Sequence, residues 1–294
     1  MFRYCFLRYP GGKAKAVTLS YDDGVRFDVP LARIIEKYGI KCTFNLNTGF
    51  MTEDRKNTKL MPEEVKAELL DHGHEVAVHG KFHKAPGLCR PVDIASDVLD
   101  CRRELEEMFG IIIRGMAYPD SGIRNIQNGT EYPKIKEILE DMNIVYSRTL
   151  GGDNNEFKLP TDWHAWMPTA HHKNPNILEW AKEFAEVDPE QGYGARRWPR
   201  LFYLWGHSYE FNNDNNWDHL EAICQILGGR EDTWYATNME IYDYVTAYNR
   251  LVFSADGSMV YNPSLIKVWF DMDGKQYSIE PGQTIKPDSP SSFK

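Results

Sequence analysis

Short apolar runs alternate with longer amphipathic runs along most of this chain, and this alternation limits its fold most strictly. Strands are predicted near residues 16–21, 41–46, 75–78, 113–118, 144–148, 162–166 and 201–206, with a weaker strand at 233–236. Helices are predicted between them, at residues 28–38, 62–72, 91–109, 131–142, 175–187, 214–227 and 238–250. This order is typical of βαβ units in a parallel sheet. Seven or eight such units predict an α/β barrel that spans residues 1–250.

The last part of the chain has a different pattern. From residue 251 onward, short runs of alternating polarity are separated by Asp256-Gly257 and Asp273-Gly274. Asp-Gly pairs between such runs favour hairpin turns. We therefore expect residues 251–294 to form a small C-terminal β appendage, with a frayed tail from Lys286 onward.

Composition excludes several classes of partner. The net charge of −9 opposes binding to nucleic acids or anionic membranes. No apolar run approaches the roughly 18 residues that a membrane span needs. The five cysteines lack CxxC spacing, so they predict neither a disulfide framework nor a cysteine zinc site. We expect a cytoplasmic protein, although a chain trimmed of its leader would look the same, and the sequence leaves a homo-oligomer open.

Two adjacent carboxylates end the first predicted strand. In the segment Thr18-Leu-Ser-Tyr-Asp22-Asp23-Gly24, they follow a buried run and precede a glycine that lets the backbone turn. A carboxylate buried without a partner is unfavourable, so we expect a cation beside them. A metal ion is the natural candidate.

Two histidines four positions apart follow the third predicted strand. The segment Glu75-Val-Ala-Val-His79-Gly-Lys-Phe-His83 places their imidazoles at the same end of the sheet as Asp22 and Asp23. One carboxylate and two imidazoles are a typical ligand set for a divalent metal.

Other chemically active residues also follow predicted strands, where the loops of a barrel meet at one mouth. They are Tyr118 and Asp120 after the fourth strand, Arg148 after the fifth, residues 162–172 around the sixth and His207 after the seventh. Each has an ordinary alternative. An Asp-Asp-Gly segment can be a solvated turn, paired histidines can lie on the surface, His207 can be a core histidine, and tryptophans such as Trp163 can simply fill the core. Their shared place at strand ends favours the functional interpretation.

The combination resembles the polysaccharide deacetylase family, which is the NodB-homology domain of carbohydrate esterase family 4. Its hallmark is a strand ending in (T/S)-(F/Y)-D-D-G followed by H-x-x-x-H. The corresponding segments here are Ser20-Tyr-Asp-Asp-Gly24 and His79-Gly-Lys-Phe-His83. The resemblance covers roughly residues 14–250 and implies a distorted (β/α)7–8 barrel.

The resemblance also implies roles for individual residues. Asp23, His79 and His83 would bind a divalent metal, usually Zn2+, although Co2+, Ni2+ or Mn2+ also suits these ligands. Asp22 would be the general base, and His207 would match the family's general acid.

Three motifs depart from the family pattern. The third motif usually begins with arginine, but this chain has Ala117-Tyr118-Pro119-Asp120, so Arg148 or Arg114 would have to replace that arginine. The backbone N–H of Asp120 would fall where the family places its oxyanion donor. Asp162-Trp163 is a weak match to the fourth motif, and the fifth motif reads Trp-Gly-His207 rather than leucine-histidine.

These residues predict a metal-dependent enzyme that removes N-acetyl groups from an amino sugar, an oligosaccharide or a polysaccharide. Aromatic side chains at the mouth, such as Trp163, Tyr118 or Tyr209, would stack on a sugar ring. One alternative is a hydrolase of another C–N bond, in a ureide or cyclic imide. The other is a non-catalytic carbohydrate-binding barrel.

Overall fold

The computed structural model describes residues 3–192 and 194–288. Its main sheet consists of parallel strands in the order β6-β5-β4-β3-β2-β8-β7, and β9 also pairs with β2. These strands are β2 (Lys15–Asp22), β3 (Cys42–Leu46), β4 (Glu75–Val78), β5 (Gly115–Ala117), β6 (Tyr146–Arg148), β7 (Ala170–His171), β8 (Arg200–Gly206) and β9 (Thr233–Tyr235).

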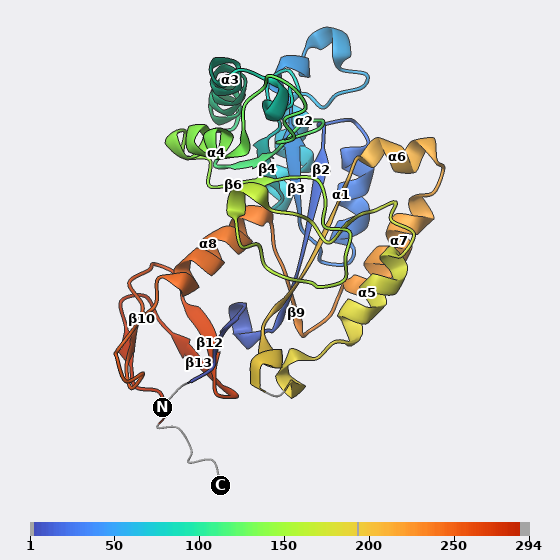
Figure 1. Cartoon of the computed structure of the whole chain (residues 1–294). Helices are drawn as coiled ribbons and strands as arrows, with labels where there is room; N and C mark the ends of the chain where they lie inside the picture. Colours follow the sequence, from blue (N-terminus) through green and yellow to red (C-terminus); the bar gives the residue numbers. More distant parts are fainter. Residues whose placement is uncertain (1–2, 193, 289–294) are drawn as a thin grey trace.

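Helices cover the outside of this sheet (Figure 1). They are α1 (Asp28–Glu36), α2 (Pro62–Glu68), α3 (Pro91–Phe109), α4 (Tyr132–Asp141), α5 (Ile177–Glu186), α6 (Ser208–Asn213), α7 (Trp217–Leu227) and α8 (Asn238–Asn249). Local signals define several ends. Pro91 opens α3 and Gly110 ends it in the left-handed conformation, while Thr237 and Glu240 form a capping box at the start of α8.

The sheet curls into the expected distorted (β/α) barrel. Every residue of β2 is buried, as expected for a central strand of a parallel sheet. One edge of β2 pairs with β8. Along its other edge, Lys15–Val17 pair with β9 and Leu19–Asp22 pair with β3. A single bridge between Arg148 and Trp166 links β6 to the segment leading into β7, which brings the two ends of the sheet together.

The strand predicted at residues 162–166 is wrong. Residues Trp163–Ala165 form a short 3-10 helix, η6, and the strand of this unit is β7, which comes later. Asp162 accepts a hydrogen bond from the backbone N–H of His164 at 2.9 Å, which favours a turn at this position. The apolar run around Trp163 therefore packs as a turn rather than as a strand.

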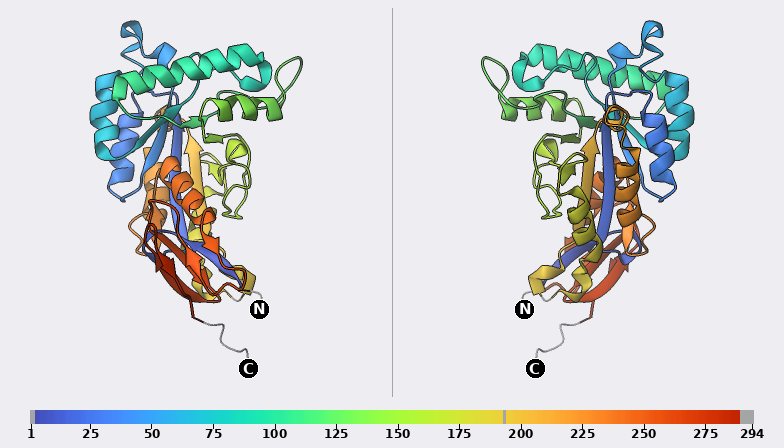
Figure 2. Two further views of the ribbon diagram at one scale, coloured as in Figure 1. Left: turned by 90° about the vertical axis from the view of Figure 1, so that its left-hand side faces the viewer. Right: turned by 90° about the vertical axis from the view of Figure 1, so that its right-hand side faces the viewer.

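Two small antiparallel sheets lie at the opposite end of the molecule from α3 (Figure 2). One has the order β1-β12-β13, and the other has the order β10-β11-β14. The strands are β1 (Cys5–Arg8), β10 (Val252–Phe253), β11 (Val260–Tyr261), β12 (Val268–Met272), β13 (Lys275–Ile279) and β14 (Thr284–Ile285). Asp273 and Gly274 both have positive φ in the turn between β12 and β13, as the sequence predicts. The division of the chain at residue 250 stays a prediction.

A buried ionic network joins β1 and β12 to the barrel. Asp271 of β12 is fully buried and forms an ion pair with Arg197, whose Nη2 lies 2.7 Å from Asp271 Oδ2. The same nitrogen lies 2.6 Å from Glu190 Oε2. Arg8 of β1 is fully buried and lies beside both carboxylates. None of the helices in the described ranges combines the length and the apolar character needed to cross a lipid bilayer.

Candidate functional site

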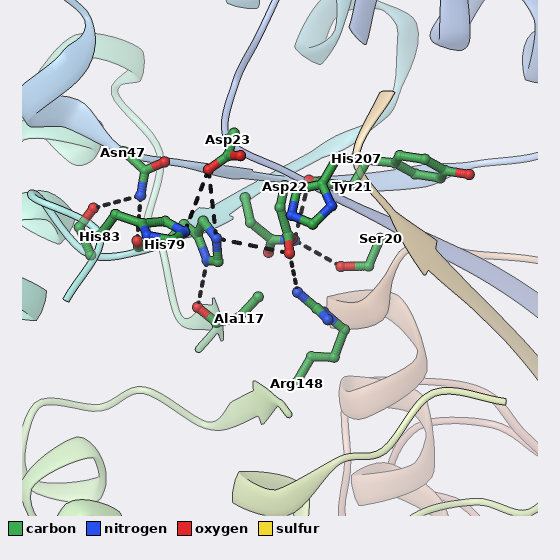
Figure 3. A network of polar contacts seen from close by, with 12 residues as sticks. Ser20, Tyr21, Asp22, Asp23, Asn47, His79, His83, Ala117, Arg148 and His207 are labelled. Atoms are coloured by element: carbon green, nitrogen blue, oxygen red, sulfur yellow. Dashed lines mark hydrogen bonds and ion pairs between the residues drawn. The ribbon is translucent and has the colours of Figure 1, made fainter. Parts of the chain in front are cut away.

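Asp23, His79 and His83 lie together at the mouth of the barrel, after β2 and β4 (Figure 3). Asp23 Oδ1 is 3.9 Å from His79 Nε2 and 3.6 Å from His83 Nε2. Ligand atoms arranged tetrahedrally around one zinc ion at about 2.1 Å are about 3.4 Å apart. The three residues that the motifs select are therefore spaced to hold one divalent ion after a small adjustment.

The hydrogen bonding of His79 leaves a nitrogen free for a metal. Its Nδ1 lies 2.8 Å from the carbonyl of Ala117, which requires the proton to be on Nδ1. Its Nε2 is buried and has no hydrogen-bond partner in the described part of the chain. Burial also lowers the pKa of His79, so the imidazole is neutral. This arrangement, with the second ring nitrogen donating to a carbonyl, is usual for histidine ligands.

The backbone turn at Asp23 explains why two adjacent carboxylates face the same imidazole. Successive side chains of a strand point to opposite faces. Asp23 has a φ of 83°, which turns its side chain back, so that His79 Nε2 lies 3.8 Å from Asp22 and 3.9 Å from Asp23. The turn is held by the Asp23 N–H, which donates to Asn45 at 3.0 Å, and by Lys59, which donates to the Asp23 carbonyl at 2.6 Å.

Asp22 is buried and paired with Arg148. The guanidinium Nη2 donates to Asp22 Oδ2, and Asn45 Nδ2 donates to Asp22 Oδ1 at 2.8 Å. Burial raises the pKa of Asp22, but the charge of Arg148, with His207 and the hydrogen bond from Asn45, outweighs burial and leaves the pKa below its usual value. Asp22 is therefore an anion at neutral pH.

The structure separates the two arginines considered for the third-motif role. Arg148 is the last residue of β6 and contacts Asp22, whereas Arg114 precedes β5 and binds Asp243 of α8 at 2.9 Å. Arg148 comes from the strand next to Ala117, and its guanidinium lies 4.3 Å from the centre of the Trp205 ring.

His207 lies half-buried at the end of β8, with a carboxylate behind it. Its Nδ1 is 3.4 Å from Glu210 Oε2, and the same oxygen accepts the backbone N–H of His207 at 3.2 Å. Burial lowers the pKa of His207, but Glu210, Asp22 and Asp23 together outweigh burial and raise it. Sequence reasoning missed Glu210, although His-x-x-Glu at the start of a helix is a recognisable capping pattern.

Glu210 also contacts two neighbouring histidines. His171 Nε2 is 3.1 Å and His172 Nε2 is 3.4 Å from Glu210 Oε2, and Lys173 Nζ is 3.8 Å from Oε1. Burial raises the pKa of Glu210, but His171, His207 and His172 outweigh it and hold the pKa far below its usual range. Glu210 is thus a permanent anion behind His207.

The spacing of His171, His207 and Glu210 also suits a metal, but the protonation of His171 does not. The backbone N–H of Lys173 donates to His171 Nδ1 at 3.1 Å, so the neutral ring carries its proton on Nε2, facing Glu210. A protonated nitrogen cannot bind a metal. The group is therefore a carboxylate surrounded by imidazoles, in contrast to the cluster at His79.

Tyr118 and Asp120 differ in their surroundings. Tyr118 is buried, and its hydroxyl donates to the carbonyl of His164 at 2.9 Å. This contact directs the phenol into the protein rather than toward a substrate. Asp120 is exposed and has a φ of 50° in the loop after β5.

Asp162 and Trp163 lie away from the cluster. Asp162 binds the hydroxyl of Tyr132 at 2.6 Å and Lys136 at 3.1 Å, beside α4. Trp163 packs edge-on against Trp166 and Tyr242. The two residues line a hollow of about 290 Å³ with residues 143–145, apart from Asp23, His79 and His83.

Comparisons with solved structures show where the fold recurs. A Mycobacterium smegmatis protein assigned to the polysaccharide deacetylases superposes with a TM-score of 0.53 and 16% identity, over 83% of this chain and 94% of its own. A family 4 acetyl xylan esterase from Clostridium thermocellum, solved with a cobalt ion, gives a TM-score of 0.46 and 16% identity over 78% and 90%. A CE4 family pseudoenzyme from Bacillus anthracis gives 0.49 and 15% over 81% and 68%. Only the first likeness is close enough to show a shared fold.

The sequence comparisons give a match to a family model over part of the chain. No curated protein sequence matches the chain. Residues 9–130 match the family model described as polysaccharide deacetylase. That segment contains Asp22, Asp23, His79 and His83 but ends before Arg148 and His207. The match confirms the resemblance for residues 9–130, the part of the chain that carries both hallmark motifs.

Proposed function

We propose that this protein is a metal-dependent hydrolase that removes N-acetyl groups from an amino sugar within an oligosaccharide or polysaccharide. The observation that supports it most is the grouping of Asp23, His79 and His83 beside an ionised Asp22, with His207 on another strand end of the same mouth. The family match supports the same chemistry.

Asp23, His79 and His83 would hold the metal, most simply Zn2+. When bound, such an ion lowers the pKa of a water molecule and polarises a carbonyl oxygen. Asp22 accepts the proton that the water loses as it attacks the acetyl carbon. Arg148 and Asn45 donate hydrogen bonds to the two oxygens of Asp22, so the proposed base keeps one orientation and stays ionised.

His207 donates the proton that the leaving amine requires, because an amide nitrogen departs poorly as an anion. Its raised pKa keeps a larger fraction of the imidazole protonated near neutral pH than an ordinary histidine would have. The contact between Nδ1 and Glu210 leaves Nε2 to face the reaction. Base and acid are thus separate residues on separate strands.

A second candidate is hydrolysis of another C–N bond, in a ureide or a cyclic imide. The observation that favours it is the altered third motif, where Ala117 stands in place of the usual arginine and Arg148 contacts Asp22 instead. This change alters the mouth where a substrate's acyl group would lie. A non-catalytic carbohydrate-binding barrel is less well supported, because ligands, base and acid are all present.

The test compares substrates on the metal-loaded protein. We expect acetate release from N-acetylglucosamine oligomers and no turnover of allantoin or succinimide. The Asp22→Asn variant should lower kcat by about 10²- to 10⁴-fold and keep its metal. Asp162→Asn, which changes an aspartate outside the cluster, should retain the wild-type rate. Turnover of allantoin or succinimide without acetate release would establish the second candidate, and full activity of Asp22→Asn would remove the proposed base.

A further inference from the structure

Asp28 and Ser208 form a buried hydrogen bond between two loops of the site. Ser208 Oγ donates to Asp28 Oδ1 at 2.5 Å, and both residues have 0% exposure. Asp28 is the first residue of α1 and follows Asp23 by five positions, while Ser208 directly follows His207. The bond therefore joins the loop that carries Asp22 and Asp23 to the turn that carries His207.

The Asp28 carboxyl has few other partners. Its Oδ2 is buried without a hydrogen-bond partner in the described part of the chain. Burial raises the pKa of Asp28 to about 8, with Asp23 adding to the rise and Ser208 and Lys59 opposing it. The group is therefore a neutral acid at pH 7, which Asn would replace closely in shape and charge.

We propose that Asp28 is a positioning residue that fixes His207 through Ser208. The inference rests on the proposed role of His207 as the acid. His207 has an extended backbone and lies directly before α6, which begins at Ser208. Glu210 holds the His207 ring from α6 itself, so it moves with that helix. The bond to Asp28 ties α6 to α1, which follows the neighbouring strand β2.

This anchoring matters because proton transfer depends strongly on distance. A misplacement of about 1 Å can lower a rate by about 10²-fold. Loss of the Asp28 contact would leave the His207 turn free to shift relative to Asp22, while the three ligands of the metal stay attached to β2 and β4. The expected signature is a lower kcat with unchanged KM and unchanged metal affinity.

The test uses Asp28→Ala, Asp28→Asn, Ser208→Ala and the double variant Asp28→Ala/Ser208→Ala, all loaded with Zn2+. We expect Asp28→Ala and Ser208→Ala each to lower kcat by roughly 10- to 100-fold, and the double variant to lose no more than either alone. Asp28→Asn should stay near wild type, because its side-chain oxygen still accepts from Ser208. Glu36→Ala, at the far end of α1, is the control and should leave kcat unchanged.

Two outcomes would overturn the inference: wild-type kcat in Ser208→Ala, or a parallel loss of zinc affinity in Asp28→Ala. Should Asp28→Ala fail to fold, Ser208→Ala carries the test, because it removes a single oxygen atom. A readout without substrate separates this inference from the proposed function. The ring nitrogen chemical shifts of His207 should change in Ser208→Ala and stay unchanged in Asp28→Asn, whether or not acetylated sugars are hydrolysed.

Discussion

Replacing Arg148 by Met tests the most deeply buried charge pair of the site. The side chain of Arg148 is 0% exposed and that of Asp22 is 3% exposed, and the two are in direct contact. Removal of one partner leaves the other as a buried charge with too few compensating contacts, which costs about 3–5 kcal/mol. Asn45 still donates to Asp22, and this remaining bond favours the lower end of that range.

The stability lost in Arg148→Met depends on pH through the pKa of Asp22. The folded pKa of Asp22 is lowered, so its contribution to stability is present above the unfolded pKa and is lost as pH falls through the folded value. Without Arg148 the folded pKa rises, and protonation then relieves the buried charge. The difference in stability between wild type and Arg148→Met should therefore shrink as pH falls toward about 4.

The assay is urea unfolding of the metal-free protein, so that no bound ion compensates Asp22. Asp22→Asn and the double variant complete the cycle, and the double variant should recover much of the loss because no buried charge remains. Arg90→Met, which breaks an exposed pair with Asp93, is the control and should leave the unfolding midpoint unchanged. A loss below about 1 kcal/mol for Arg148→Met, or simple additivity in the cycle, would refute the reasoning.

Three further predictions concern the metal and the acid. His79→Ala should abolish zinc binding measured by calorimetry, whereas His74→Ala, a buried histidine paired with Glu36, should retain it. Zinc at 100 times its Kd should stabilise the wild type by about 2.7 kcal/mol in unfolding experiments and leave Asp23→Asn nearly unaffected; equal stabilisation of both would contradict the ligand set. Glu210→Gln should move the alkaline limb of the kcat profile to lower pH, because the carboxylate that raises the pKa of His207 is lost; an unmoved limb would show that Glu210 does not act on the acid.

Much of the barrel could be predicted from the sequence because its strands are short apolar runs between well-marked helices. The helix predicted at residues 91–109 matches α3, which begins at Pro91 and is ended by Gly110. The apolar run around Trp163 was wrongly predicted to be a strand, because its tryptophans pack in a turn whose geometry depends on Asp162. Helix α6 was also missed, since six residues next to α7 give no separate periodic signal.

The cluster of Asp23, His79 and His83 could be predicted from the sequence because its residues lie in two compact motifs. The contacts of Asp22 and His207, the proposed base and acid, could not, because they depend on which strands are neighbours. Arg148 reaches Asp22 from a strand across the barrel, and in the sequence only its place at the end of a predicted strand separates it from Arg114. Glu210 is three positions from His207, but its contacts with His171 and His172 depend on the pairing of β7 with β8.

The pairing of β1 with β12 affects the order in which the protein can assemble during synthesis. Arg8 lies opposite Trp269, so β1 leaves the ribosome about 260 residues before its partner strand β12. At about 5–20 residues per second, this delay is on the order of tens of seconds. During that time Leu7 and Arg8 have no native partner strand, so a nascent chain stalled near residue 250 would expose β1 to chaperones and proteases.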